Sequence, residues 1–291
     1  AASAFLPSGF EKAAILTVDG VGENVTATIS KGEKNKIITL KEMLYPHSVG
    51  LLYSTITTFL GFKANSGEYK VMGLAPYGNP NKYKSLFKEK IVTIYSDGSI
   101  KLNLEFFDFS NSKRMYKKSL ETLFNLKART SEKETLKKIH MDIAASLQVV
   151  VEEIILLMAK HAKKITKLNK LCMAGGVALN CVANTKILKA GHFKNLWVQP
   201  AAGDAGGALG AALLVWHKEL DKPRRISKID SMNGAFLGPK YNQEEIENSL
   251  LKCGAKFEVL DDDSIIKTTA KALAEGKAVG WFQGRMEFGP R

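Results

Sequence analysis

The fold prediction starts from one stretch, AILTVDGVGEN at residues 14–24. Its first five residues are apolar or β-branched and lead into Asp19, as in a buried strand, and Gly20 and Gly22 mark a tight turn. Residues 25–30 alternate β-branched and small side chains, which is typical of a second strand, and residues 37–40 predict a third. Strand, glycine turn and strand together predict a β-hairpin.

Working outward from this hairpin, strands and helices alternate along the chain. Helices are predicted from apolar spacing at residues 48–60, 133–164, 179–189, 205–216, from Gln243, and 264–275. Strands are predicted at residues 91–95 and 100–104 around an Asp-Gly turn, and at 170–174, 196–199, 257–260 and 279–282. Such a mixture of hairpins and alternating elements predicts an α/β fold with a mixed sheet.

Composition narrows the functional classes. The 291 residues are enough for about two domains. The net charge is +13, but the basic residues are scattered and have little aromatic interleaving, so nucleic acid is not an expected partner. Three cysteines without metal-like spacing favour a reducing, cytoplasmic location. No run of about 20 apolar residues predicts a transmembrane helix.

Two further glycine turns follow predicted strands. Residues 174–180 read AGGVALN and residues 200–210 read PAAGDAGGALG, each between a strand and a helix. Bare backbone and a helix N-terminus suit phosphate binding, and Asn180 could contact a ribose or phosphate oxygen. Asp204 could cap its helix or bind a metal, as could Asp19. Each turn alone also has a structural explanation, as a hairpin, a packed turn or a helix cap.

Taken together, the three turns resemble the split nucleotide site of the actin, sugar-kinase and heat-shock-chaperone superfamily. That resemblance implies a two-lobed, actin-like, ribonuclease-H-like mixed-sheet fold. The strings YPHSVGLLY at 45–53 and SGEYKVMGLAPYG at 66–78, with residues 174–184 and 199–211, resemble signature segments of the carbamoyltransferase family. This family includes the NodU-like and tobramycin O-carbamoyltransferase-like enzymes, and the resemblance covers residues 1–291.

The family resemblance implies a reaction. Carbamoyl phosphate and ATP would form carbamoyladenylate in a YrdC-like domain, and an actin-like domain would pass the carbamoyl group to an acceptor hydroxyl. Residues 1–217 would be the nucleotide- and metal-binding domain. Residues 218–291 would be a connector and the incomplete start of the YrdC-like domain. The chain is therefore expected to be truncated at both ends and inactive alone.

The resemblance also implies site residues. A divalent metal of the iron type would be held by Asp19 and Asp204 with two upstream histidines that precede this sequence, so its occupancy is left open. No catalytic residue is assigned. The nucleotide, as ATP or carbamoyladenylate, would contact Gly20, Gly22, Glu68, Lys70, Gly73, Gly175, Gly176, Asn180 and Gly203.

Several alternatives remain open at this point. The chain could be a non-catalytic nucleotide-binding module, a nucleic-acid-binding protein, or a kinase that shares the fold without explaining residues 66–78. The acceptor is not identified. Residues 105–135, with Phe106, Phe107, Phe109 and Tyr116, either line an acceptor pocket or pack in the core. Oligomerisation is left open, and no membrane partner is expected.

Overall fold

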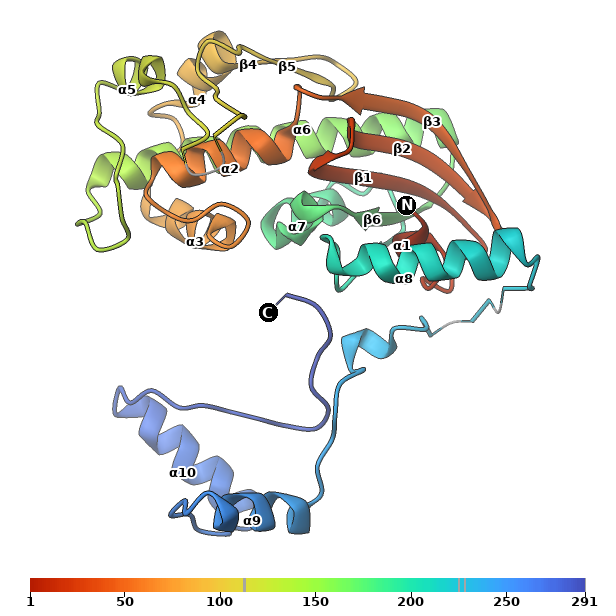
Figure 1. The fold of residues 1–291 in the computed structure, drawn as a ribbon, viewed down its shortest axis with the longest axis vertical. Coiled ribbons are helices and arrows are strands. Elements are labelled where there is room, and N and C mark those ends of the chain that lie inside the picture. The colour runs from red at the N-terminus through yellow and green to blue at the C-terminus, as the bar shows by residue number, and fades with distance from the viewer. Residues whose placement is uncertain (112–113, 225, 228, 291) are drawn as a thin grey trace. The chain divides into compact units, whose positions relative to one another are not determined.

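The computed structural model describes residues 1–111, 114–224, 226–227 and 229–290. Contacts within the chain divide it into two compact units, Ala1–Ser231 and Met232–Arg291. Figure 1 shows the elements of each unit, coloured along the chain. Each unit is described by itself below.

A five-stranded mixed sheet forms the centre of the first unit. Its order is β3-β2-β1-β6-β7. The strands are β1 (Lys12–Gly22), β2 (Val25–Glu33), β3 (Lys36–Leu44), β6 (Lys170–Ala174) and β7 (Asn195–Val198). β1 pairs antiparallel with β2, and β2 with β3, whereas β1–β6 and β6–β7 are parallel. The predicted α/β fold with a mixed sheet is therefore confirmed.

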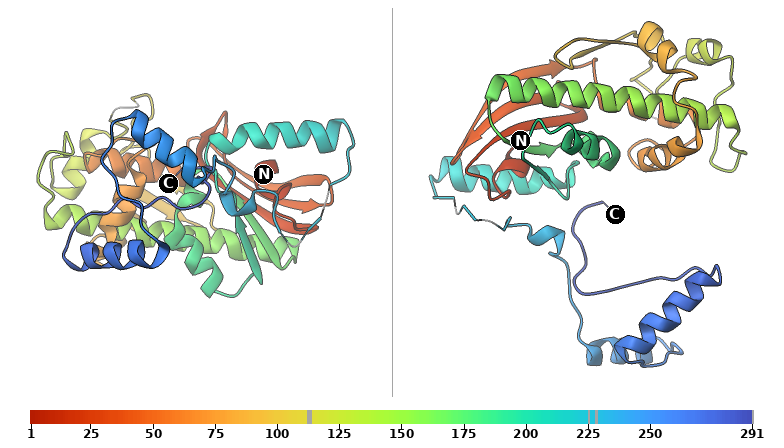
Figure 2. Two further views of the ribbon diagram at one scale, coloured as in Figure 1. Left: turned by 90° about the horizontal axis from the view of Figure 1, so that it is seen from below. Right: turned by 180° about the vertical axis from the view of Figure 1, so that it is seen from behind.

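Helices cover both faces of this sheet. Successive side chains of β1 point to opposite faces, so they contribute to two different core clusters. Leu16 and Val18 join the core cluster that includes α2 (Val49–Phe59) and α6 (Lys138–Thr166). Ile15 joins a second cluster with Phe5 of α1 (Ala2–Phe5) and Leu213 of α8 (Ala205–Leu214). The views in Figure 2 show α6 running the length of one face, with the sheet beside it. β1 is thus buried from two sides.

Smaller elements surround this core. They are α3 (Glu68–Leu74), α4 (Lys84–Leu86), the hairpin strands β4 (Val92–Ile94) and β5 (Ile100–Leu102), α5 (Lys118–Phe124) and α7 (Cys181–Lys189). The hairpin confirms the turn predicted at Asp97 and Gly98. The helix predicted at residues 133–164 begins later, at Lys138. Arg224, in the segment predicted as a connector, packs within the first unit, because its guanidinium donates to carbonyl oxygens of Phe5, Leu6 and Phe10.

The second unit contains α9 (Gln243–Lys252) and α10 (Asp262–Ala274), and no residue of either helix is buried. The strands predicted at residues 257–260 and 279–282 are wrong: both segments lack strand structure. A strand is held by hydrogen bonds to a neighbouring strand. The described residues of the second unit contain no strand that could serve as that neighbour. The segments of this unit with helix-forming patterns are therefore helical, whereas the segments with strand-forming patterns are not strands.

Within the part of the chain that the structure describes, no helix combines the length and the apolar character that spanning a membrane requires.

Candidate functional site

Three glycine turns meet at the carboxyl ends of the parallel strands. Asp19, near the end of β1, accepts hydrogen bonds at Oδ1 from the backbone N–H of Gly20 (2.8 Å) and of Gly176 (3.1 Å). Gly175 donates its N–H to the carbonyl oxygen of Ala202 at 2.7 Å, in the loop that follows β7. These hydrogen bonds join stretches that are far apart in the sequence into one edge of the sheet.

Gly175 is the residue on which this convergence depends. Its φ is +95°, and a Cβ atom placed there would lie 2.2 Å from the carbonyl oxygen of Val18. Only glycine lets β6 turn this closely against β1. The next residue, Gly176, would meet only the Asp19 carboxylate within 4 Å, at 3.2 Å. The turn is therefore packed at its first glycine and open at its second.

The N-terminus of α2 completes this edge, although no site role was predicted for it from the sequence. Ser48 caps the helix by accepting from the Leu51 N–H, and its hydroxyl donates to the carbonyl oxygens of Asp19 (2.9 Å) and Gly20 (2.6 Å). A Cβ at Gly50 would lie 2.5 Å from the Asp19 carbonyl oxygen. A serine before an apolar helix signals a cap, but nothing local indicates what the cap touches.

Gly203 and Asp204 lie at the start of α8. A Cβ at Gly203 would meet no atom within 4 Å. Asp204 occupies the N-cap position, is exposed, and makes no side-chain capping hydrogen bond. Among the described residues, no partner of its carboxylate is found, so it is available to a cation or ligand. This differs from Asp19, one of whose oxygens is committed to two backbone amides.

The donor set for a metal is small. No three His, Cys, Asp or Glu side chains of the described residues lie close enough together to hold a metal ion. Asp19 and Asp204 are carboxylates, which suit divalent cations. His47, in one of the family-like strings, accepts a hydrogen bond at Nδ1 from the Leu102 N–H at 3.2 Å. It therefore anchors the β4–β5 hairpin.

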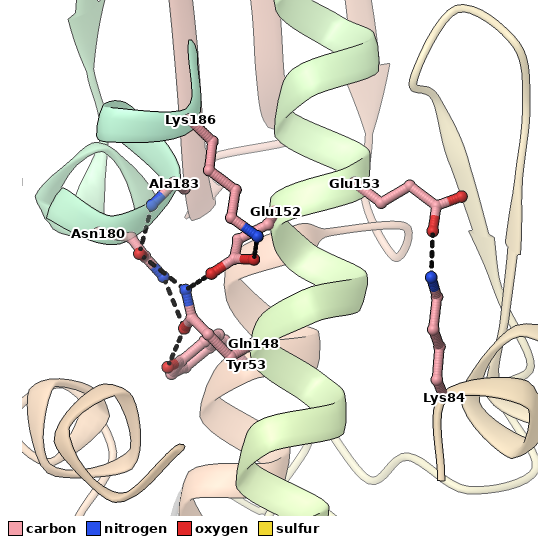
Figure 3. Close-up of polar contacts among 8 residues, drawn as sticks. All are labelled: Tyr53, Lys84, Gln148, Glu152, Glu153, Asn180, Ala183 and Lys186. Carbon is pink, nitrogen blue, oxygen red and sulfur yellow. Dashed lines mark hydrogen bonds and ion pairs between the residues drawn. The ribbon is translucent and has the colours of Figure 1, made fainter. Parts of the chain in front are cut away.

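Asn180 lies under the turn in a polar cluster, which Figure 3 shows. Its Oδ1 accepts from the Ala183 N–H and from Gln148 Nε2, both at 3.0 Å, and its Nδ2 donates to Gln148 Oε1 at 3.0 Å. Gln148 also accepts from the Tyr53 hydroxyl and donates to Glu152. Asn180 is 8% exposed. Its amide therefore fixes the start of α7 and is turned into the protein.

The same cluster contains a buried carboxylate and a buried phenol. Glu152 on α6 is paired with Lys186 of α7. The pKa of the Tyr53 hydroxyl is raised by burial, and the charges of Glu68 and Glu152 raise it further. Figure 3 also shows the Lys84–Glu153 ion pair separately, around α6 from the cluster. The cluster is a set of mutually satisfied groups that holds α2, α6 and α7 together.

Of the remaining predicted contacts, Glu68, Lys70 and Gly73 lie on α3, and Gly22 lies in the first glycine turn. Glu68 accepts from the Ser54 hydroxyl (2.6 Å) and from backbone N–H groups at the start of α3. Lys70 pairs with Glu132 at 2.6 Å. Gly73 is exposed, and Gly22 lies in the β1–β2 hairpin. α3 contacts α2, so Glu68, Lys70 and Gly73 connect to the glycine turns through that helix.

Comparison with known proteins identifies relatives over the whole chain. The family model for the carbamoyltransferase N-terminus matches residues 1–213. An uncharacterized protein of Synechocystis is 48% identical over 293 residues, covering 100% of this chain and 47% of that protein. Nodulation protein NolO of Bradyrhizobium diazoefficiens is 35% identical over 292 residues, covering 100% of this chain and 50% of NolO.

A named enzyme matches a shorter stretch. The 3'-hydroxymethylcephem-O-carbamoyltransferase of Streptomyces clavuligerus is 31% identical over 121 residues, covering 42% of this chain and 21% of the enzyme. The chain spans about half the length of the Synechocystis and nodulation relatives.

Proposed function

This chain belongs to the carbamoyltransferase family, and on that premise we propose that it holds a carbamoyladenylate over its three glycine turns during O-carbamoyl transfer. One observation carries the proposal: the hydrogen bonds that join Asp19 to Gly176 and Gly175 to Ala202. They bring bare backbone from three strand ends to one edge. Such an edge suits a phosphate because backbone N–H groups and a helix N-terminus can face it closely.

The transfer step follows from the chemistry of the donor. The acceptor hydroxyl oxygen bonds to the carbamoyl carbon, the bond from that carbon to the adenylate phosphate oxygen breaks, and AMP leaves with that oxygen. The hydroxyl proton is released in the same step. ATP and carbamoyl phosphate are the proposed sources of the adenylate, and the acceptor is a hydroxyl-bearing small molecule, which the described residues do not identify.

The residues take separate roles in this proposal. Gly176 and Gly203 leave room for the ligand, and Ser48 and Gly50 set the N-terminus of α2 against Asp19. Asp19 and Asp204 are the carboxylates that would hold a divalent metal of the iron type, with further ligands from outside the described residues. Such a metal would supply Lewis-acid polarisation of a carbamoyl or phosphate oxygen. Asn180 acts by fixing α7.

An actin-like, ribonuclease-H-like fold is the architecture we propose for the first unit. Three antiparallel strands followed by two parallel ones, with helices on both faces, support it. We further propose that residues 1–217 form the nucleotide-binding domain. Residues 218–291 would then lead into the domain that forms the adenylate.

Nucleotide affinity tests the proposal directly. Gly176→Val places a side chain in the open part of the turn, where only Asp19 lies within 4 Å. We expect magnesium and a non-hydrolysable ATP analogue to bind at least about tenfold more weakly by calorimetry. Gly280→Val, in the second unit, is the matched control and should leave affinity unchanged. Unchanged affinity of Gly176→Val, with unchanged thermal unfolding, would contradict the site.

A non-catalytic nucleotide-binding module is the second candidate. It is favoured by the absence of any three-residue metal cluster among the described residues. Release of AMP from preformed carbamoyladenylate discriminates between the two, because this step does not require the domain that forms the adenylate. Turnover by the protein supports transfer, whereas analogue binding without turnover or bound metal supports the module.

A further inference from the structure

A pocket of about 740 Å³ lies at the opposite end of α2 from the glycine turns. Ser48, at the start of α2, contacts Asp19 and Gly20, whereas Thr58 and Gly61, at its end, line this pocket. α2 has 11 residues, so its two ends are about 16 Å apart at the usual helical rise. The pocket is therefore distinct from the site of the proposed function.

A buried guanidinium forms one wall of the pocket. Arg129 is 4% exposed and lies over the ring of Phe62, 5.3 Å from its centroid. Its terminal nitrogens donate to the carbonyl oxygens of Leu60, Glu132 and Glu134, and its Nε has no partner. No carboxylate of the described residues lies within ion-pair distance of it. Carbonyl dipoles therefore hold this buried charge directly, and the carboxylates of Glu132 and Glu134 act on it only from beyond ion-pair distance.

The other cationic side chains of the pocket also lack a carboxylate partner among the described residues. Lys63, Arg114 and Lys118 are exposed lining residues, and within the described part of the chain none of them forms an ion pair. Arg114 lies over the Tyr116 ring, 4.9 Å from its centroid.

Two acids line the pocket, and both are already engaged. Glu121 accepts from the Ala128 N–H at 3.1 Å, and Glu132 pairs with Lys70. The pocket therefore has four cationic side chains and two carboxylates in its wall, and one of these carboxylates is paired with Lys70, which is not a lining residue.

Burial governs the pKa of Arg129 and of the neighbouring His140. The pKa of His140 is lowered by burial first, the charges of Arg129 and Lys137 lower it further, and the charge of Glu134 partly offsets these effects. The pKa of Arg129 is lowered by burial, and the charges of Glu134 and Glu132 partly offset that. In both cases the nearby carboxylates compensate only part of the cost of burying a charge.

We propose that this pocket is a binding site for a small anion carrying a phosphate or carboxylate group, held by Lys63, Arg114 and Lys118 in front of Arg129. Charge-assisted hydrogen bonds from lysine and arginine are the usual contacts of such groups. The Phe62 and Tyr116 rings would pack against the rest of the ligand. The inference does not depend on carbamoyl transfer, because it uses none of the residues of the glycine turns.

Lysine acetylation read by mass spectrometry tests the site in the unmodified protein. Inorganic phosphate and malonate are titrated separately, at constant ionic strength set with chloride. We expect at least one of them to protect Lys63 and Lys118 with a saturable dependence, while Lys189, an exposed lysine of α7 without an ion pair among the described residues, stays reactive. Protection by phosphate alone or by malonate alone supports the site and identifies the group it takes. Equal protection of Lys189, or protection by neither anion, would overturn it.

Calorimetry on variants gives a second, independent readout. Arg129 also ties the end of α2 to the following loop, so the exposed lysines are the better targets. Lys63→Ala and Lys118→Ala should each weaken binding of the protecting anion by about tenfold, which is typical for a hydrogen bond to a charged group. Lys189→Ala should not change it. Unchanged affinity in both lysine variants would overturn the proposal, whereas Gly176→Val should leave this affinity intact even where nucleotide binding is lost.

Discussion

Helices α6 and α10 carry comparable apolar spacing but differ in what covers them. In the first unit, Ile143, Leu147 and Ile154 of α6 are completely buried. In the second unit, Ile266 and Leu273 of α10 are each 57% exposed. α10 is supported locally instead, since its N-cap Asp261 accepts from the Ser264 N–H at 2.8 Å. Similar apolar patterns therefore give a buried core helix, α6, and an exposed helix, α10, that is stabilised by its N-cap.

This contrast explains where a site can be built. Burying an apolar side chain contributes about 1.5–3 kcal/mol, and α6 buries many of them, so the strands and turns beside it are held rigidly. Close approaches such as that of Gly175 to Val18 need such a scaffold. Within the described residues of the second unit, no buried helix is present to hold a comparable turn.

Replacing a glycine of positive φ by alanine should lower the free energy of unfolding much more in the first unit than in the second, and this is the largest difference that we expect. Gly175→Ala places a Cβ 2.2 Å from the Val18 carbonyl oxygen, whereas Gly276→Ala, after α10, meets no atom within 4 Å. We expect the first to lower the free energy of unfolding by about 4 kcal/mol or more, a loss that requires a strained or clashing core position. The second should cost about 1 kcal/mol, the price of a left-handed alanine. Urea titrations followed by circular dichroism measure both, and equal losses would break the comparison.

Removing one ion pair from each unit should give an intermediate difference in stability loss. Lys186 pairs with Glu152, which is 5% exposed, and its removal leaves that buried carboxylate with only Gln148 as a partner. We expect Lys186→Ala to destabilise the first unit by about 2 kcal/mol. Lys277 pairs with Glu275 at 2.6 Å on the exposed surface of the second unit, and Lys277→Ala should cost less than about 0.5 kcal/mol. Thermal unfolding of the two variants decides the matter, and a larger effect at Lys277 would reverse the ranking.

The smallest expected difference between the two units is a loss of unfolding free energy at alkaline pH that is due to a buried thiol of the first unit. Burial raises the pKa of the Cys172 thiol from 9.0 to about 12. Below pH 9 the thiol is protonated in both states, and above it the unfolded chain loses its proton first. Stability is therefore lost as pH rises from 9 towards 12, by about 1.4 kcal/mol at pH 10.

The two cysteine variants separate this effect from general alkaline unfolding. Cys172→Ala should reduce the slope of unfolding free energy against pH, with the raised pKa of Tyr53 leaving part of it. Cys253, exposed in the second unit, is the control, and Cys253→Ala should keep the slope. An unchanged slope in Cys172→Ala would show that burial of this thiol does not govern the alkaline loss.

Much of the architecture could be predicted from local signals. The strand at residues 170–174 is β6 as predicted, and the helix expected at residues 48–60 is α2, capped by Ser48. These elements succeed because apolar spacing and caps act over a few neighbouring residues. The two strands predicted in the second unit fail, because a strand depends on a partner that a local pattern does not contain.

The sequence by itself determined the glycine turns, the strands that precede them and the family they resemble. The tertiary structure decided how those turns are used: it joined Asp19 to Gly176, turned Asn180 into the protein, and tied Lys70 to Glu132. The metal and nucleotide roles of these residues stay predictions. Composition and spacing act along the chain, whereas each of these contacts joins residues that only the packing of α2, α6 and the sheet brings within hydrogen-bonding distance.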